Sequence, residues 1–395
     1  KPYPAYRDSG VEWIGQVPSK WEVKPIKIVA TFNDDVLPDS TAADTPISYV
    51  DISSVSYAAG IGSTEEMLFG NAPSRARRKA KVGDVVISTV RTYLKAVAAV
   101  DAAHADCVYS TGFAVLRSRT GHIEPNFLKW LALNELFIQS VESHSEGLSY
   151  PAINAPELVN LKTVMPSLPE QATIAVTIDR ETARFDALIA KKTRFIELLK
   201  EKRQALITHA VTKGLNPKAK MKASGVEWIG EVPEHWVAIK FNHVARVTEG
   251  LVDPKAHPYR EMVLIAPNHI ESGTGKILGL ETAVFQNAES GKYTCKKGAV
   301  IYSKIRPALA KVAIAPCDCL CSADMYPMDC TDLSYPEWLF YLMLSPPFTS
   351  WAILESDRVA MPKINRESLA DLRVFLPPME EQLAAVEWLK IQLQK

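Results

Sequence analysis

The chain has 395 residues, equal numbers of basic and acidic side chains (45 of each) and a hydrophobic fraction of 47%. This length suits two domains of ordinary size, each with its own apolar core. Zero net charge excludes attraction of nucleic acid by the whole-molecule field, so any such binding must come from local basic patches. No stretch reaches the roughly 20 apolar residues of a membrane span, and no signal peptide precedes the first motif. We therefore expect a cytoplasmic protein without a membrane partner. Because there is no initiator Met and the chain stops abruptly at Lys395, we also expect trimming at both ends.

One phrase of thirteen residues occurs twice. The copy at Ser9–Trp21 reads S-G-V-E-W-I-G-Q-V-P-S-K-W, and the copy at Ser224–Trp236, 215 positions later, reads S-G-V-E-W-I-G-E-V-P-E-H-W. A long period present only twice is not that of a solenoid, whose units run to a few tens of residues. The repetition predicts two similar globular domains in tandem, at residues 1–168 and 215–378.

Further matches keep this register. V-G-D-V-V-I-S-T-V-R ends at Arg91 and K-G-A-V-I-Y-S-K-I-R ends at Arg306, again 215 apart. Two further motifs recur at an offset of 211. Pro-x-Ile-Asn occurs at 151–154 and 362–365, and Glu-Gln occurs at 170–171 and 381–382. β-Branched runs predict strands at 85–90 and 299–305, and later segments predict helices at 124–140 and 335–344. Neither half alternates strands and helices regularly. We expect an α/β (α+β) fold, with two mixed domains and largely antiparallel or mixed sheets.

A long helix is expected at 169–214. Gly and Pro are absent between Pro169 and Gly214, and apolar residues recur with the spacings of a heptad seam. The predicted seam consists of Ile174, Ile178, Phe185, Leu188, Phe195, Leu199 and Leu206. Such a helix needs a partner along its apolar stripe. Residues 379–395 begin a second, shorter helix that we expect to pair antiparallel with it, leaving part of the seam unpaired or closed by another subunit.

The repeated phrase itself has two interpretations. Its large apolar residues form a strip that fastens each domain's start to the long helices, or they dock a partner subunit, since exposed tryptophans suit interfaces. The residues concerned are Trp13, Ile14, Val17, Trp21, Trp228, Ile229, Val232 and Trp236. The anchoring interpretation is favoured.

No catalytic, cofactor or metal motif withstands comparison of the two halves. Residues 345–348 (Ser-Pro-Pro-Phe) resemble an amino-methyltransferase motif, but residues 134–137 of the first half lack the prolines and no Gly-rich turn for S-adenosylmethionine is present. The prolines are interpreted as a helix stop. Residues 273–276 lack the spacing of a phosphate loop. The six cysteines lack C-x2-C pairs, so they are expected to be reduced and structural. We expect no cofactor and no metal.

Basic residues recur at matched places, where few acids lie nearby. The candidates for DNA contact are Arg75, Arg77, Arg78, Lys79, Lys81, Arg91 and Lys95 in the first half and Lys292, Lys296, Lys297, Lys304 and Arg306, with Lys311 nearby, in the second. Lysines and arginines neutralise phosphates, and a planar arginine can read guanine by two parallel hydrogen bonds. The alternative is a solvated surface, or strand-edge lysines that deter aggregation. Tyr93 and Tyr293 could stack on bases or belong to the core.

The repeated phrase, the G-D-V-V-I-S-x-x-R strand and the P-x-I-N…E-Q run into a long helix, all present twice, resemble the DNA-specificity subunit of type I restriction-modification systems. The resemblance implies a non-catalytic prokaryotic subunit whose two target recognition domains read the halves of a split, asymmetric site in double-stranded DNA. It also implies a helical ruler between the halves, two methyltransferase subunits and restriction/translocase subunits as partners. Divergence between 57–78 and 272–293 is expected to make the half-sites differ. A two-domain protein scaffold with incidental basic patches is the competing interpretation, and a self-sufficient modification enzyme is a third.

Overall fold

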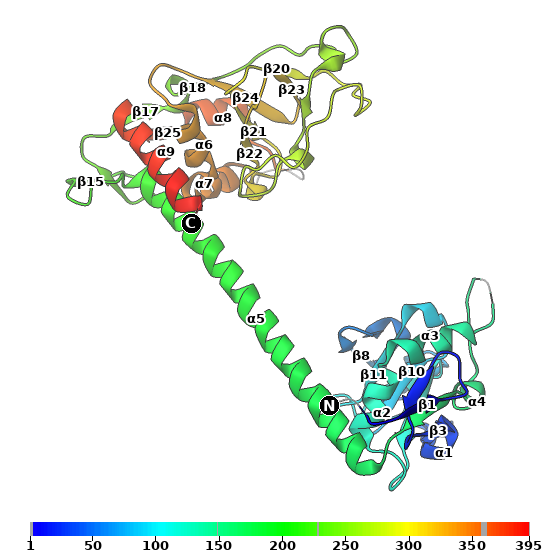
Figure 1. The fold of residues 1–395 in the computed structure, drawn as a ribbon. Coiled ribbons are helices and arrows are strands. Elements are labelled where there is room, and N and C mark those ends of the chain that lie inside the picture. Colours follow the sequence, from blue (N-terminus) through cyan, green and yellow to red (C-terminus); the bar gives the residue numbers. More distant parts are fainter. Residues whose placement is uncertain (1–2, 148, 227–228, 357–361, 395) are drawn as a thin grey trace. The chain divides into compact units, whose positions relative to one another are not determined.

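The computed structural model describes residues 3–147, 149–226, 229–356 and 362–394 (Figure 1). The chain divides into two compact units, Lys1–Ala190 and Lys191–Lys395. The dividing point therefore lies inside helix α5 (Leu168–Thr212), of which each unit takes a part. The order of elements in the first unit is repeated in the second, except that the described residues of the second unit contain no counterpart of α1 (Ile26–Val29), β6 (Val55–Ser56), β7 (Gly60–Ile61) or β8 (Glu65–Leu68). The predicted tandem arrangement of mixed α/β domains is confirmed.

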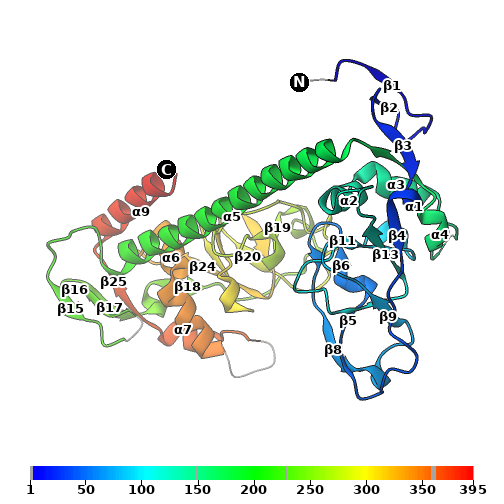
Figure 2. The same cartoon turned by 90° about the horizontal axis from the view of Figure 1, so that it is seen from below.

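The first unit is built on two four-stranded sheets (Figure 2). One has the order β11-β10-β13-β4 and is antiparallel throughout; the other has the order β8-β5-β12-β9 and contains one parallel pair, β5 with β12. The strands are β4 (Ala30–Phe32), β5 (Pro46–Val50), β8 (Glu65–Leu68), β9 (Ala76–Lys79), β10 (Val85–Ser88), β11 (Val97–Ala99), β12 (Val108–Ser110) and β13 (Phe113–Ser118). The expectation of largely antiparallel or mixed sheets is thus correct.

Three two-stranded pairs and four helices complete the first unit. The pairs are β1 (Tyr6–Asp8) with β2 (Gln16–Pro18), β3 (Glu22–Pro25) with β14 (Lys162–Met165), and β6 (Val55–Ser56) with β7 (Gly60–Ile61). The helices are α1 (Ile26–Val29), α2 (Pro125–Ala132), α3 (Glu135–Ser143) and α4 (Ala155–Leu158).

The second unit repeats this plan. Its antiparallel sheet has the order β18-β24-β21-β22, its three-stranded sheet has the order β19-β23-β20 with β19 and β23 parallel, and β15-β16 and β17-β25 form pairs. The strands are β15 (Met221–Ala223), β16 (Glu231–Pro233), β17 (Val237–Lys240), β18 (Ala245–Val247), β19 (Leu264–Ile265), β20 (Tyr293–Cys295), β21 (Val300–Ser303), β22 (Val312–Ile314), β23 (Cys319–Cys321), β24 (Met325–Cys330) and β25 (Arg373–Leu376). The helices are α6 (Pro336–Leu344), α7 (Pro346–Ser356), α8 (Arg366–Asp371) and α9 (Met379–Gln394).

The central strand of each unit is apolar on both faces because it separates two cores. In β10, Val85 and Ile87 join the core that contains α2 and α3, whereas Val86 joins the core beneath the second sheet. In β21, Val300 and Ile301 divide between two cores in the same way. Alternate residues of a strand point to opposite faces, so a continuous apolar run is what such a position requires.

The predicted helix 124–140 is two helices. It breaks at Asn134, whose side-chain oxygen accepts the N–H of Leu136 at 2.9 Å and so caps α3. Asparagine is a strong N-cap, and this local bond competed successfully with continuation of the helix. In the second unit, Ser345 occupies the corresponding place, ending α6, and the prolines that follow open α7. The interpretation of these prolines as a helix stop is right for α6 but missed the helix they begin.

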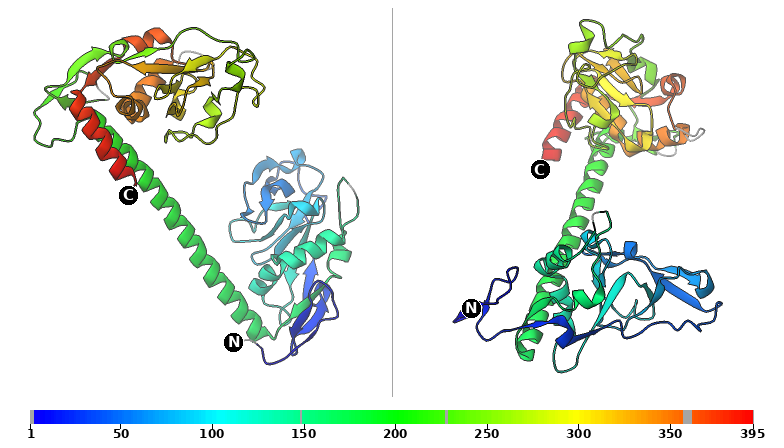
Figure 3. Two further views of the ribbon diagram at one scale, coloured as in Figure 1. Left: turned by 45° about the horizontal axis from the view of Figure 1, so that its top comes forward. Right: turned by 90° about the vertical axis from the view of Figure 1, so that its right-hand side faces the viewer.

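The long helix expected between Pro169 and Gly214 is confirmed as α5, a single helix of 45 residues. Gly214, with a φ of 70°, follows it, as expected of a helix terminator. The second helix is α9, which runs antiparallel beside the last part of α5 (Figures 1 and 3). Val386 and Leu389 of α9 share a core with Ile207 and Val211 of α5.

The predicted seam of α5 is covered only near its ends. Ile174, Ile178 and Leu206 are half-buried, whereas Phe185 and Phe195 are exposed to 62% and 61% of their surface. Leu188 and Leu199 are also exposed. The expectation that part of the seam lacks a partner within the chain is met for these residues. None of the described helices combines the length and apolar composition needed to cross a membrane.

The repeated phrase anchors each unit to the helix that follows it, and in the first unit it also contacts α3. Trp21 and Trp236 reach the starts of α5 and α9, where their indole N–H groups lie 3.5 and 3.1 Å from a glutamate. Trp13 instead packs against Phe137 of α3, with ring centroids 6.3 Å apart. Trp228 lies outside the described residues. The anchoring interpretation is confirmed for Trp21 and Trp236.

Candidate nucleic-acid interface

Each unit presents one exposed arginine on the turn after its central strand. Arg91 follows β10 and precedes the 3-10 helix Thr92–Leu94; Arg306 follows β21 and precedes the 3-10 helix Pro307–Leu309. Both arginines have a left-handed backbone, with φ values of 50° and 49°. This conformation is uncommon outside glycine and costs on the order of 1 to 3 kcal/mol. The same conformation recurs at Lys95 and Ala310, at the far end of each 3-10 helix, so the two units share one turn geometry.

The Pro-x-Ile-Asn segments hold these turns in place. The main-chain N–H of Arg91 donates to the carbonyl of Pro151 at 2.7 Å, and that of Arg306 donates to Pro362 at 2.9 Å. Two residues on in the segment, the main-chain N–H of Ile153 donates to the carbonyl of Thr89 at 2.9 Å. Each segment therefore extends the ladder of the central strand up to the arginine. The recurrence of Pro-x-Ile-Asn reflects this backbone contact.

The asparagine that closes each segment starts a helix. Asn154 accepts the N–H of Glu157 at 2.9 Å, and Asn365 accepts the N–H of Ser368 at 2.7 Å. Each cap fixes the C-terminal end of its Pro-x-Ile-Asn segment, and the hydrogen bond from the arginine N–H fixes the N-terminal end. The left-handed turn is therefore bonded to a segment that is held at both ends.

In the first unit, most of the predicted DNA-binding cations already have an acidic partner. Arg75 lies 2.8 Å from Asp51, Arg77 lies 3.6 Å from Asp39, Lys81 lies 3.5 Å from Asp35 and Lys95 lies 2.5 Å from Glu135. The hydrogen bond to Glu135 raises the pKa of Lys95. Arg77 also lies over the ring of Phe69, 4.7 Å from its centroid. Such residues can still contact phosphates, but their charge is partly neutralised.

Three of the predicted DNA-binding cations in the first unit have no acidic partner among the described residues. Lys79 and Arg91 are exposed, and the Arg91 guanidinium lies 4.9 Å from the ring centroid of Tyr150. Arg78 is half-buried, its Nε atom makes no hydrogen bond, and burial lowers its pKa. These three carry the uncompensated positive charge of the predicted set. Tyr93, the aromatic side chain predicted nearby, is exposed.

In the second unit, Lys296, Lys297 and Arg306 are exposed. Lys304 lies over the Tyr326 ring, 5.3 Å from its centroid. Lys292 is not one of the exposed cations of the second unit. Its side chain is 7% exposed and its ammonium group donates to both oxygens of Ser290, at 2.5 and 2.7 Å, while burial lowers its pKa. Lys292 lies 215 positions after Arg77, at the offset of the repeat, but the second unit encloses the lysine. Lys311 likewise donates internally, to the carbonyl of Pro267 at 2.6 Å.

Sequence reasoning missed Arg366. It follows the second Pro-x-Ile-Asn directly, as the first residue of α8, and its guanidinium lies 5.5 Å from the ring centroids of both Tyr293 and Tyr326. Its position next to the motif was the available signal. The corresponding residue of the first half is Ala155, so comparison of the halves concealed it.

The glycine-rich segment 273–276 presents carbonyls to a cation. Arg203 of α5 donates to the carbonyl oxygens of Gly273 and Thr274 at 2.6 and 3.0 Å. A phosphate loop presents N–H groups to an anion, which is the opposite polarity. This segment therefore serves to attach a loop of the second unit to α5.

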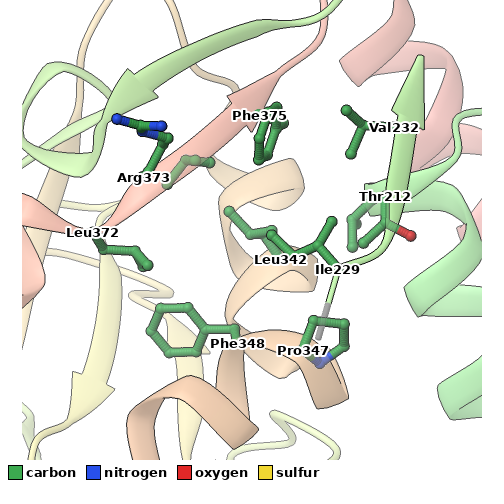
Figure 4. A pocket seen from close by; sticks show the side chains of 11 residues that line it. Thr212, Ile229, Val232, Leu342, Pro347, Phe348, Leu372, Arg373 and Phe375 are labelled. Atoms are coloured by element: carbon green, nitrogen blue, oxygen red, sulfur yellow. The ribbon is translucent and has the colours of Figure 1, made fainter. Parts of the chain in front are cut away.

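The apolar pocket in Figure 4 lies among α6, α7 and β25 of the second unit. Phe348, Leu342 and Phe375 project into it, and its volume is about 30 Å³. A space of this size has room for about one water and none for a nucleotide cofactor. Among the described residues, no group of three or more histidines, cysteines or acids is arranged to hold a metal ion.

Known proteins share both the sequence and the fold. Residues 233–393 match the family described as Type I restriction modification DNA specificity domain. Over 284 residues the chain is 34% identical to the Type I restriction enzyme EcoDI specificity subunit of Escherichia coli, covering 67% of this chain and 63% of that subunit. The chain belongs to the type I restriction-modification DNA specificity family. The resemblance carried by the repeated motifs is confirmed.

Two solved structures share the fold of this specificity-family chain. One comes from work on complex assembly and conformational transition of the type I R-M system, with a TM-score of 0.70 and 22% identity, covering 96% of this chain and 91% of that one. The other is the HsdS subunit from Thermoanaerobacter tengcongensis, with a TM-score of 0.58 and 23% identity, covering 96% and 90%. The match to the E. coli subunit spans less than two thirds of that protein's length. That relative is named as a specificity subunit, which is a non-catalytic role.

Proposed function

We propose that this chain reads a bipartite, asymmetric site in double-stranded DNA, each unit serving one half. The observation that carries the proposal is the pair of left-handed turns that expose Arg91 and Arg306 at the same place in both units. Strain of this kind is retained where a side chain must be aimed at a ligand. An arginine on a rigid turn can contact a phosphate or two acceptors on a guanine edge.

The surrounding charge supports the same function. Lys79 in the first unit and Lys296 and Lys297 in the second are exposed and have no acidic partner among the described residues. Each lysine or arginine that neutralises a phosphate releases counterions, which contributes about 0.9 to the slope of log affinity against log salt. Because net charge is zero, affinity must arise from these local sets.

The roles of α5 and of partner subunits belong to the same proposal. A single helix that leaves one reading unit and enters the other would fix the spacing of the two half-sites, and linking the two units raises affinity through effective concentration. The exposed apolar residues Phe185, Leu188, Phe195 and Leu199 would provide a docking stripe for methyltransferase subunits, which restriction/translocase subunits then join. Methylation and cleavage would lie in those partners, so the chain itself would need no cofactor.

Salt dependence of DNA binding tests the core of the proposal. The purified chain should bind mixed-sequence duplex DNA with an affinity that falls steeply as salt rises. A protein scaffold with incidental basic patches would show no such fall. Expression of the chain with its neighbouring subunits, followed by mapping of methylated adenines, should then give two different half-sites separated by a fixed spacer. A palindromic target, or binding insensitive to salt, would contradict the proposal.

A further inference from the structure

Arg78 and Tyr293 occupy the same place in the two units. Arg78 of β9 lies opposite Tyr109 of β12, and Tyr109 in turn lies opposite Val50 in the parallel strand β5. In the second unit, Tyr293 of β20 lies opposite Cys321 of β23, which lies opposite Ile265 in β19. The register of three strands therefore equates the two residues, and the offset of 215 in sequence agrees.

Arg78 is held without a partner for its charge. Its neighbours Arg75 and Arg77 pair with Asp51 and Asp39, but no described carboxylate lies within ion-pair distance of Arg78. Its Nε atom is buried without a hydrogen bond, and burial lowers its pKa. Keeping a guanidinium half-buried and uncompensated costs free energy. Such a group is expected where a ligand supplies the missing acceptors.

Tyr293 fills the equivalent place in a different manner. Its hydroxyl accepts a hydrogen bond from Arg366 at 3.1 Å, and the Arg366 guanidinium faces its ring at 5.5 Å. That guanidinium also donates to Glu249 at 3.2 Å and to the carbonyl of Thr248 at 3.1 Å, so three hydrogen bonds hold it in place. Arg366 is therefore a positioning residue that fixes Tyr293. The second unit offers a phenol where the first offers a free guanidinium.

We propose that Arg78 reads a base of the half-site served by the first unit, and that the exchange of arginine for tyrosine at this ladder position makes the two half-sites differ. Because the Nε atom of Arg78 is buried, its two terminal Nη groups are the ones that would meet a ligand, and they fit the O6 and N7 acceptors on the major-groove edge of guanine. The inference rests on the proposed DNA-reading function. It assigns the difference between the two half-sites to one residue pair, Arg78 and Tyr293.

Selection from a randomised duplex pool by the pure chain tests this inference. Compared with the parent, Arg78→Lys, which keeps the charge but loses the planar fork, should relax preference at one base pair by roughly 5- to 150-fold. Preferences in the other half-site should remain. Tyr293→Phe should relax preference in the half-site served by the second unit and leave the preferences of the first half-site unchanged. Lys79→Met is the matched control: this exposed neighbour should weaken all sequences alike and reduce the salt slope by about 0.9.

A stability measurement separates a reading role from a structural one. Arg78→Met removes an uncompensated charge, so its midpoint of urea unfolding should equal or exceed that of the parent while the base preference is lost. If Arg78→Lys and Arg78→Met select the parent's sequences, or if Arg78→Met lowers the unfolding midpoint, the inference is wrong although the chain still reads DNA. If the parent itself shows no salt-dependent binding to the pool, the proposed function has failed instead.

Discussion

Trp236 donates its indole N–H to a carboxylate oxygen of Glu381 at 3.1 Å, at the first turn of α9. In the first unit the indole of Trp21 lies 3.5 Å from Glu170, at the first turn of α5. The last tryptophan of each repeated phrase thus ties the start of its unit to the helix that follows that unit. This pairing accounts for the joint recurrence of the phrase and the Glu-Gln pair, although they are about 150 positions apart in sequence.

These two contacts should differ in strength. Trp236→Phe removes a hydrogen bond to a charged group from a fully buried ring and should lower the free energy of unfolding by about 1.5 to 3 kcal/mol. Trp21→Phe should have a smaller effect, because the bond is longer and the ring is partly exposed. Urea unfolding followed by far-ultraviolet circular dichroism measures both. An equal or larger loss for Trp21→Phe would contradict this ranking.

Replacing the glutamine that follows each of these glutamates should lower the free energy of unfolding more than replacing the tryptophan does. Gln382 is fully buried; its side chain accepts from Tyr335 and donates to Leu333 and Pro377, all at 2.8 to 2.9 Å. Gln382→Ala removes the side-chain partner of three backbone groups, one of them buried, and should destabilise the unit by on the order of 3 kcal/mol. The exposed Gln139→Ala on α3 is a control that should change stability little. Similar unfolding midpoints for the two variants would show that water replaces the amide.

The left-handed turns should trade stability for function. Arg91→Gly relieves the positive φ and should raise the free energy of unfolding by up to about 1 kcal/mol, while weakening DNA binding by about 1 to 3 kcal/mol. Ala310→Gly, at a φ of 43°, should give a similar stability gain with unchanged DNA binding. Equal binding by Arg91→Gly and the parent, with intact folding, would make the arginine structural.

The base or phosphate role of Arg91 can be resolved with Arg91→Ala. If Arg91 reads a base, this variant should relax only the half-site served by the first unit. If it contacts a phosphate, all sequences should weaken alike and the salt slope should fall by about 0.9. Titration of duplexes altered in one half-site at a time, at two salt concentrations, distinguishes the outcomes.

Helix α5 should determine the spacer and leave the half-sites unchanged. Four residues inserted near Lys191 lengthen the helix by about 6 Å, close to two base pairs at roughly 3.4 Å each. Methylation mapping should then show the same half-sites with a spacer longer by one or two base pairs. Altered half-site bases at an unchanged spacer would mean that α5 belongs to the reading surface.

The isolated chain should not bind S-adenosylmethionine, because its sequence contains no glycine-rich turn to cradle the cofactor. Isothermal titration calorimetry of the pure chain with S-adenosylmethionine should show only heats of dilution. Saturable one-to-one binding would overturn the assignment of methylation to a partner subunit.

The sequence by itself determined the duplicated plan of this protein and its longest helix. Two copies of one phrase at a fixed offset require two similar units. The stretch 170–213, which lacks glycine and proline and carries a heptad stripe, leaves few alternatives to a continuous helix. Local patterns of this kind act through backbone propensity and periodicity, which are present in the chain before it folds. The sequence did not predict the break at Asn134, because a capping bond competed there with an otherwise helical pattern.

Only the tertiary structure decided which cations are available. Lys292 matches Arg77 in the alignment but is buried against Ser290, and Lys95 is neutralised by Glu135, which is 40 positions away. The strained backbone at Arg91 is hydrogen-bonded to a carbonyl from the distant Pro151. Burial, charge pairing and backbone strain arise from contacts between segments far apart in the chain, and a sequence pattern records the residues of such contacts but not their partners.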